Sequence, residues 1–182
     1  MVMVITGHRP KKLYNIYNIY HPFYIEIGKE IRNILLTKVK ALTKGEKLIL
    51  VTGMALGIDT MYALIALKLK KQYPGMIELW CYPPNKHVNP KWSKSDIERY
   101  NYILSQSDRT EYCSEKYSGY TTMYKRDEAM VDILNSHTGE VISVWNGVEA
   151  GGTYHTKKYA EDKGIKVTNI NPIDFFHLAN KK

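Results

Sequence analysis

Short apolar segments alternate along this chain with longer segments in which apolar residues recur every three or four positions. The short segments, most of them rich in Val, Ile and Leu, predict strands at residues 2–6, 48–52, 76–82, 109–113, 140–145 and 166–170. The long segments predict helices at residues 24–42, 61–72, 95–107, 122–134, 153–163 and 172–179. Strands that are almost continuously apolar are buried on both faces. The pattern therefore predicts an α/β fold of three layers, a doubly wound, mostly parallel, Rossmann-like sheet with helices on both faces.

The stretch at residues 48–62 contains the clearest candidate chemistry. An apolar strand stops at Gly53, and Gly57 precedes a long helical segment, with Met54, Ala55 and Asp59 in or beside the turn. Glycines let the backbone turn sharply and let a ligand approach, and the first N–H groups of a helix attract anions, phosphate above all. The simpler interpretation is an ordinary strand-to-helix turn with Asp59 or Thr60 as the N-cap.

Two other predicted strands end in glycine turns. The first runs into Thr6, Gly7, His8 and Arg9, where the planar guanidinium of Arg9 suits phosphate, although a surface Arg9 and a turn His8 would look the same. The fifth runs into a loop that contains Asn146, Glu149, Gly151, Gly152 and Thr153 and opens a helix. In a parallel sheet these ends share one edge, so all three turns are expected to converge on a single crevice.

Two charged residues of the segment at 122–134 are further candidates. Arg126 could reach a phosphate, but an arginine beside acidic residues is more often a surface ion-pair partner. Asp132 lies among apolar neighbours, so it is either solvated or a carboxylate held for a purpose.

Composition narrows the class of partner. Lys and Arg outnumber Asp and Glu by 26 to 18 over 182 residues, and the net charge of +8 favours an anionic partner. The two cysteines have neither zinc nor disulfide spacing, and no segment is long and apolar enough to cross a bilayer. We therefore expect one cytoplasmic domain over residues 1–182, with no metal, no resident cofactor and no membrane partner.

The turns do not match the common nucleotide motifs, since neither GxGxxG with a distal acid nor GxxxxGK[ST] is present. The motifs that do stand out are Thr6-Gly7-His8-Arg9, Gly53-Met54-Ala55-Leu56-Gly57-Ile58-Asp59, Met130-Val131-Asp132, and Trp145-Asn146-Gly147 with Gly151-Gly152-Thr153. Together they resemble the SLOG superfamily over nearly the whole chain, specifically its small stand-alone YpsA-like branch. That superfamily also contains DNA-processing A proteins and LOG phosphoribohydrolases.

The resemblance implies a Rossmann-like sheet whose glycine turns hold a nucleotide or an ADP-ribose-like ligand, often in a homo-oligomer. LOG enzymes extend their glycine loop into GGxGTxxE, whose glutamate takes part in cleaving the N-glycosidic bond. Here that position is Thr156 and the glycine spacing differs. The expected role is therefore that of a sensor or sequestering protein, with Asp59, Asp132 and Glu149 as candidate acids should the ligand be cleaved.

Three functional hypotheses follow. The first is nucleotide binding, with phosphate at the glycine turns, Arg9 neutralising charge, and Asp59 or Asp132 bonding ribose hydroxyls. The second is N-glycosidic cleavage by one of the candidate acids. The third is binding of single-stranded nucleic acid, suggested by the net charge of +8, the 15 tyrosines and stacking candidates such as Tyr17, Tyr20 and Trp92.

Overall fold

The computed structural model describes residues 1–87, 89–115 and 118–180 and contains one sheet of six strands in the order β4-β3-β2-β1-β5-β6. Every pair of neighbouring strands is parallel, which confirms the predicted fold class. The strands are β1 (Val2–Gly7), β2 (Leu48–Thr52), β3 (Ile77–Cys81), β4 (Arg109–Thr110), β5 (Gly139–Val144) and β6 (Val167–Ile170). The edge strand β4 is shorter than predicted because it pairs with β3 over two residues only, Arg109 and Thr110.

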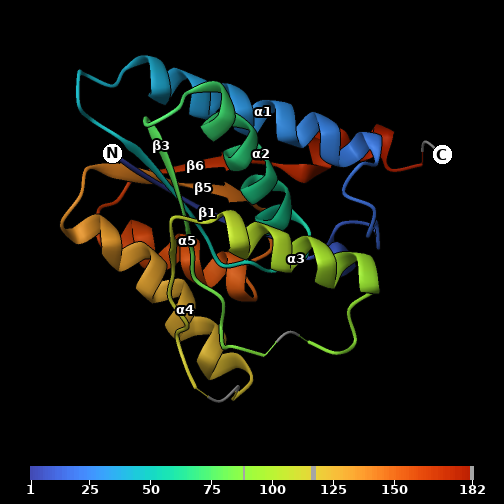
Figure 1. Cartoon of the computed structure of the whole chain (residues 1–182). Coiled ribbons are helices and arrows are strands. Elements are labelled where there is room, and N and C mark those ends of the chain that lie inside the picture. The colour runs from blue at the N-terminus through green and yellow to red at the C-terminus, as the bar shows by residue number, and fades with distance from the viewer. Residues whose placement is uncertain (88, 116–117, 181–182) are drawn as a thin grey trace.

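Helices cover both faces of the sheet. Figure 1 shows α1 (Pro22–Lys40), α2 (Ile58–Gln72) and α3 (Lys94–Gln106) on one face, and α4 (Tyr120–Asp132) and α5 (Gly152–Asp162) on the other. Three short 3₁₀ helices complete the chain: η1 (Pro10–Lys12), η2 (Ile133–Asn135) and η3 (Pro172–Leu178). The closing segment at 172–179 is therefore 3₁₀ helix, not α-helix. None of the helices described here is long and apolar enough to cross a membrane.

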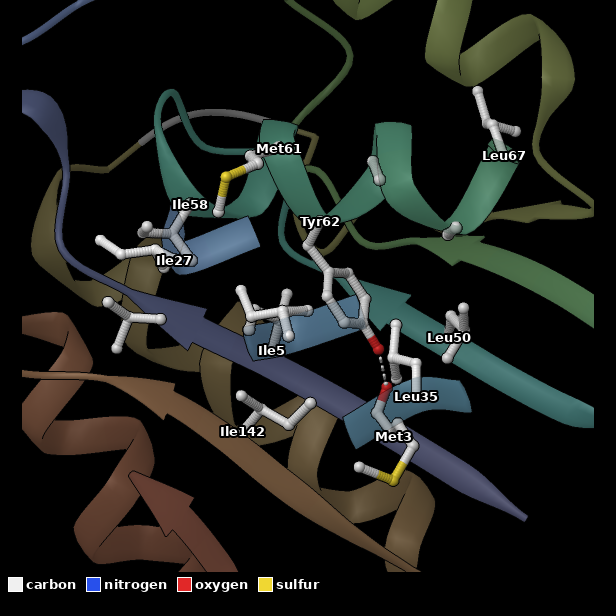
Figure 2. Close-up of a cluster of buried hydrophobic side chains, with 14 of the residues drawn as sticks. Met3, Ile5, Ile27, Leu35, Leu50, Ile58, Met61, Tyr62, Leu67 and Ile142 are labelled. Atoms are coloured by element: carbon white, nitrogen blue, oxygen red, sulfur yellow. Dashed lines mark hydrogen bonds between the residues drawn. The ribbon is translucent and has the colours of Figure 1, made fainter. Parts of the chain in front are cut away.

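Alternation along β1 shows why the sheet needs two helical layers. Met3 and Ile5 pack in the core beneath α1 and α2, whereas Val2 and Val4 belong to the core beneath α4 and α5. Figure 2 shows the first of these cores, in which the hydroxyl of Tyr62 donates to the carbonyl oxygen of Met3 at 2.8 Å. A strand that is apolar on both faces is thereby covered on both faces.

The position of β1 decides where a ligand can bind. The chain lays β2, β3 and β4 successively to one side of β1 and then returns to place β5 on the other side. Ligands of open α/β sheets bind at such a switch point, beyond the carboxyl ends of the strands. The turns after β1, β2 and β5 all lie at this edge.

Candidate functional site

A cleft with two lobes lies at the carboxyl edge of the sheet. One lobe, here called the glycine lobe, has a volume of about 570 Å³ and is lined by Thr6, Gly7, His8, Asp59, Tyr124, Asp127, Gly151, Gly152 and Thr153. The other, the tryptophan lobe, has a volume of about 1040 Å³ and is lined by Tyr17, Gly53, Met54, Asn85, Trp92, Arg99 and Tyr100. Arg9, Lys11, Ala55, Met123 and Arg126 line both lobes. The lobes are therefore neighbours that share a wall.

Most of the predicted ligand-binding residues line this cleft, whereas the predicted ligand-binding residues Asn146 and Gly57 and the candidate acid Glu149 do not. Asn146 is held by His8, whose Nε2 is 2.8 Å from the amide oxygen Oδ1 of Asn146. Burial lowers the pKa of His8, against the effect of this hydrogen bond, so the ring is neutral near pH 7. Gly57 begins α2 as its N-cap with a φ of 91°. Glu149 is exposed and accepts a hydrogen bond of 3.4 Å from Tyr154.

Asp132 lies outside the cleft. Because α4 starts at the carboxyl edge of the sheet and runs toward the amino edge, its last residue, Asp132, lies at the edge opposite the cleft (Figure 1). The Asp132 carboxylate accepts hydrogen bonds from Lys163 Nζ at 2.7 Å and from Tyr159 Oη at 3.0 Å. The apolar sequence neighbours of Asp132 face the core while Asp132 faces α5, so its carboxylate links α4 to α5.

Arg126 is buried, which corrects its interpretation as a surface ion-pair partner. Its guanidinium donates to the carbonyl oxygen of Gly53 at 2.7 Å and lies 2.6 Å from a carboxylate oxygen of Asp127. The nearest oxygen of Asp59 is 3.9 Å away. Arg126 and Asp127 follow Met123 by three and four residues and precede Met130 by the same spacing, so all four share the buried face of α4. The three charged side chains form a buried cluster between the two lobes.

Asp59 does not cap α2. It lies in the first turn of the helix, and its Oδ2 accepts from the backbone nitrogen of Ala55 at 3.2 Å, which fixes the turn before the helix. Thr60 also bonds back to Ala55, through its hydroxyl, at 2.8 Å. Burial raises the pKa of Asp59 to about 6, although the nearby Arg126 opposes the shift.

This raised pKa gives a testable pH dependence. A carboxyl whose pKa is higher in the folded state than its usual 3.8 binds more protons there, so its contribution to stability falls as the pH rises from about 4 to about 6. Asn at this position keeps the oxygen that accepts from Ala55 and carries no charge. We expect the stability advantage of Asp59→Asn over the unmodified protein to grow across this pH range, measured by urea denaturation at pH 4, 5, 6 and 7. A constant difference would show that Asp59 does not titrate there.

The glycine lobe offers donors to an anion. Thr6 and Thr153 are 6% and 8% exposed and line the lobe, and neither hydroxyl has a hydrogen-bond partner among the described residues. Thr153 is in the first turn of α5. The N-cap residue of this helix is Gly151, so no N-cap side chain accepts from the backbone N–H groups of that turn. Arg9, Lys11 and Lys12 add exposed positive charge, with Lys12 Nζ 3.1 Å from the carbonyl oxygen of Ala150. Hydroxyls, a helix N-terminus and cations around one cavity suit phosphate.

Several lining residues had escaped the sequence-based prediction. Lys11 and Lys12 directly follow the first glycine turn, so their position was readable from the sequence. Asp127 was readable only from its helical spacing to Met123 and Met130. Tyr124, whose ring stacks on His155 with centroids 4.2 Å apart, carries no local signal, whereas Asn85 follows a strand that ends in Pro83-Pro84 and so lies in a loop where ligands bind. Within the described residues, no group of three or more His, Cys, Asp or Glu side chains is arranged to hold a metal ion.

Comparison with known proteins agrees with these features. A family model described as the YspA SLOG family matches residues 3–178. UPF0398 proteins of Bacillus cereus (strain B4264) and Bacillus anthracis (strain A0248) are each 23% identical over 164 residues, which is 90% of this chain and 84% of theirs. The match extends through all the strand-end turns that form the cleft, and the chain belongs to the YspA SLOG family.

Proposed function

We propose that this protein binds a nucleotide or a nucleotide-derived, ADP-ribose-like ligand, with phosphate in the glycine lobe, and acts as a sensor or sequestering protein. The observation that carries the proposal is that Thr6 and Thr153, whose hydroxyls have no partner within the described part of the chain, line one cavity with the N-terminus of α5 at the switch point of the sheet. Membership of the SLOG family supports a nucleotide-related ligand. The homo-oligomer that the resemblance implies stays a prediction.

The charges around the lobe favour a ligand with an anionic group. With both carboxylates ionised, the cluster of Asp59, Asp127 and Arg126 carries a net charge of −1, which would repel phosphate. Arg9, Lys11 and Lys12 outweigh that charge at the open side of the lobe. A phosphate at the N-terminus of α5 would lie between these cations and the Thr153 hydroxyl.

Gly152→Asp is expected to abolish ligand binding. A Cβ on Gly152 would lie 3.3 Å from Oδ2 of Asp127, so the new carboxylate adds a second negative charge at the first turn of α5. We expect ADP-ribose or a mononucleotide to raise the melting temperature of the unmodified protein by several degrees and to leave that of Gly152→Asp unchanged, as measured by differential scanning fluorimetry.

The matched control is Val148→Asp, which adds the same charge at an exposed position of the same loop and is expected to keep the shift. Thr153→Val removes one hydroxyl with little change of shape and is expected to weaken the shift without abolishing it. If no nucleotide in a broad panel stabilises the unmodified protein, the proposed function is wrong.

Cleavage of an N-glycosidic bond is a second candidate function, favoured by the position of Asp59 in the wall of the glycine lobe beside Arg9. Asp132 and Glu149 line neither lobe. Thr156, at the position of the LOG glutamate, is fully buried and donates to the carbonyl oxygen of Gly152 at 2.8 Å, which favours binding over cleavage. Chromatography of nucleotides incubated with the protein tests this candidate, since cleavage would release free base and ribose phosphate.

A further inference from the structure

The tryptophan lobe is the larger part of the cleft, and its walls differ in chemistry from those of the glycine lobe. Trp92, Tyr100, Met54 and Pro84 give it extended apolar surface. The rings of Trp92 and Tyr100 meet edge to face, with centroids 5.6 Å apart and planes at 75°, which fixes the orientation of the indole. Such a lobe suits the flat, weakly polar part of a ligand.

One largely buried polar side chain of this lobe offers a hydrogen-bond donor to a ligand. Asn85 is 6% exposed and lines the lobe. Its amide oxygen accepts from the backbone nitrogen of His87 at 3.2 Å, and that bond identifies the other amide atom as the nitrogen. Among the described residues nothing accepts a hydrogen bond from this nitrogen. This nitrogen is a donor at the wall of the lobe, so a ligand that supplies an acceptor would gain a hydrogen bond here.

Two arginines that line the lobe are engaged within the protein, whereas the exposed cations Arg9, Lys11 and Lys91 line it without an ion pair among the described residues. Arg99 and Asp96 form an ion pair of 2.6 Å on the wall of the lobe, and the guanidinium of Arg99 also lies 5.8 Å from the ring centroid of Tyr20. Arg126 is held by Gly53 and Asp127. The apolar walls formed by Trp92, Tyr100 and Met54 favour a heteroaromatic ring in this lobe, and the cations near the shared wall suit the phosphate-bearing part of the same ligand.

We propose that the tryptophan lobe is the nucleobase site and that the ligand extends from one lobe to the other across the shared wall of Arg9, Ala55 and Arg126. The base contacts Trp92, and a ring nitrogen or exocyclic oxygen of the base accepts from the amide of Asn85. This inference rests on the proposed function, because it takes the phosphate of the same ligand to lie in the glycine lobe. It assigns the ligand to a class with a phosphoryl end and a heteroaromatic end.

Asn85→Asp tests the inference because it keeps the oxygen that accepts from His87 and removes the amide donor. Binding of ADP-ribose and of ribose 5-phosphate is measured by isothermal titration calorimetry. We expect Asn85→Asp to weaken ADP-ribose at least tenfold and to leave ribose 5-phosphate, which has no base, unchanged. Asn171→Asp is the matched control, since Asn171 lines neither lobe and its side-chain oxygen accepts from Ile173 N at 3.1 Å in the same way.

Tryptophan fluorescence provides a second measurement. ADP-ribose is expected to quench the emission of the unmodified protein, ribose 5-phosphate is not, and the quenching is expected to disappear in Trp92→Phe. Unchanged ADP-ribose affinity in Asn85→Asp, or an equal loss for both probes, would overturn the nucleobase site and leave phosphate binding intact. If neither probe binds the unmodified protein, or if Gly152→Asp binds both normally, the proposed function itself fails.

Discussion

Arg126→Met is expected to lower the free energy of unfolding at pH 7 by about 3–5 kcal/mol, since removing one member of a buried ion pair leaves its partners charged and unpaired. Asp59 and Asp127 are 4% and 3% exposed, so water cannot replace the guanidinium. The carbonyl oxygen of Gly53 also loses its hydrogen bond from Arg126. Urea denaturation at pH 7 measures the loss.

The control is Lys125→Met, which removes a positive charge at an exposed neighbouring position of α4 and is expected to change stability by less than 1 kcal/mol. Burial raises the pKa of both Asp59 and Asp127 in the unmodified protein. Without Arg126 both values should rise further, so the loss should shrink as the pH falls and both carboxyls protonate. Adding Asp127→Asn to Arg126→Met should recover part of the stability. A loss that is the same at pH 5 and pH 7 would contradict this account.

The fixed position of Arg126 has a consequence for binding. Its guanidinium is hydrogen-bonded to the turn after β2 and to Asp127, which lies beneath the first turn of α5. The wall between the two lobes is therefore set before a ligand arrives, and little conformational entropy remains to be lost there. This agrees with a protein that recognises its ligand by a preformed cleft.

The sequence predicted the architecture well because its signals are local. Continuous apolar strands and amphipathic helices specify a parallel sheet covered on both faces, and a strand that stops at glycine specifies where a turn lies. The prediction that the turns after β1, β2 and β5 would meet also followed from topology, since parallel strands place their carboxyl ends at one edge.

The sequence failed where a side chain's environment depends on another element. Arg126 and Asp132 are on the same helix. The charged neighbours of Arg126 favoured the surface, and the apolar neighbours of Asp132 left open whether its carboxylate is solvated or held for a purpose. In the structure Arg126 is buried on the face that it shares with Met123 and Met130, whereas Asp132 is partly exposed and pairs with Lys163. Residues three and four positions away, which share one face of a helix, indicate whether a side chain is buried better than its immediate sequence neighbours do.

The glycines show a second limit. Gly53 was expected to make room for a ligand, but a Cβ there would lie 2.5 Å from a guanidinium nitrogen of Arg126. Gly53 therefore accommodates a side chain of the protein itself. A sequence shows that a turn contains glycine, but it does not show whether a ligand or a side chain of the protein occupies the space that a Cβ would fill.

Gly7→Ala is expected to cost on the order of 3 kcal/mol or more, because a Cβ on Gly7 would lie 2.5 Å from Cβ and Cγ2 of Ile58. The Cβ of Ile58 is fixed by the backbone of α2, so a rotamer change cannot remove the overlap and the start of α2 must move away from the end of β1. Ile58 is fully buried, as Figure 2 shows among its core neighbours, so this movement also disturbs the core.

Gly28→Ala is the matched control, since it makes the same chemical change inside α1, where the new Cβ would lie 3.3 Å from Sδ of Met61. That sulfur belongs to a flexible side chain and alanine favours a helix, so the change in stability is expected to stay within about 1 kcal/mol. Urea denaturation of both variants, with and without ADP-ribose, separates two roles for Gly7. If Gly7→Ala is as stable as the unmodified protein but no longer responds to ADP-ribose, Gly7 is a ligand contact and the packing role is wrong.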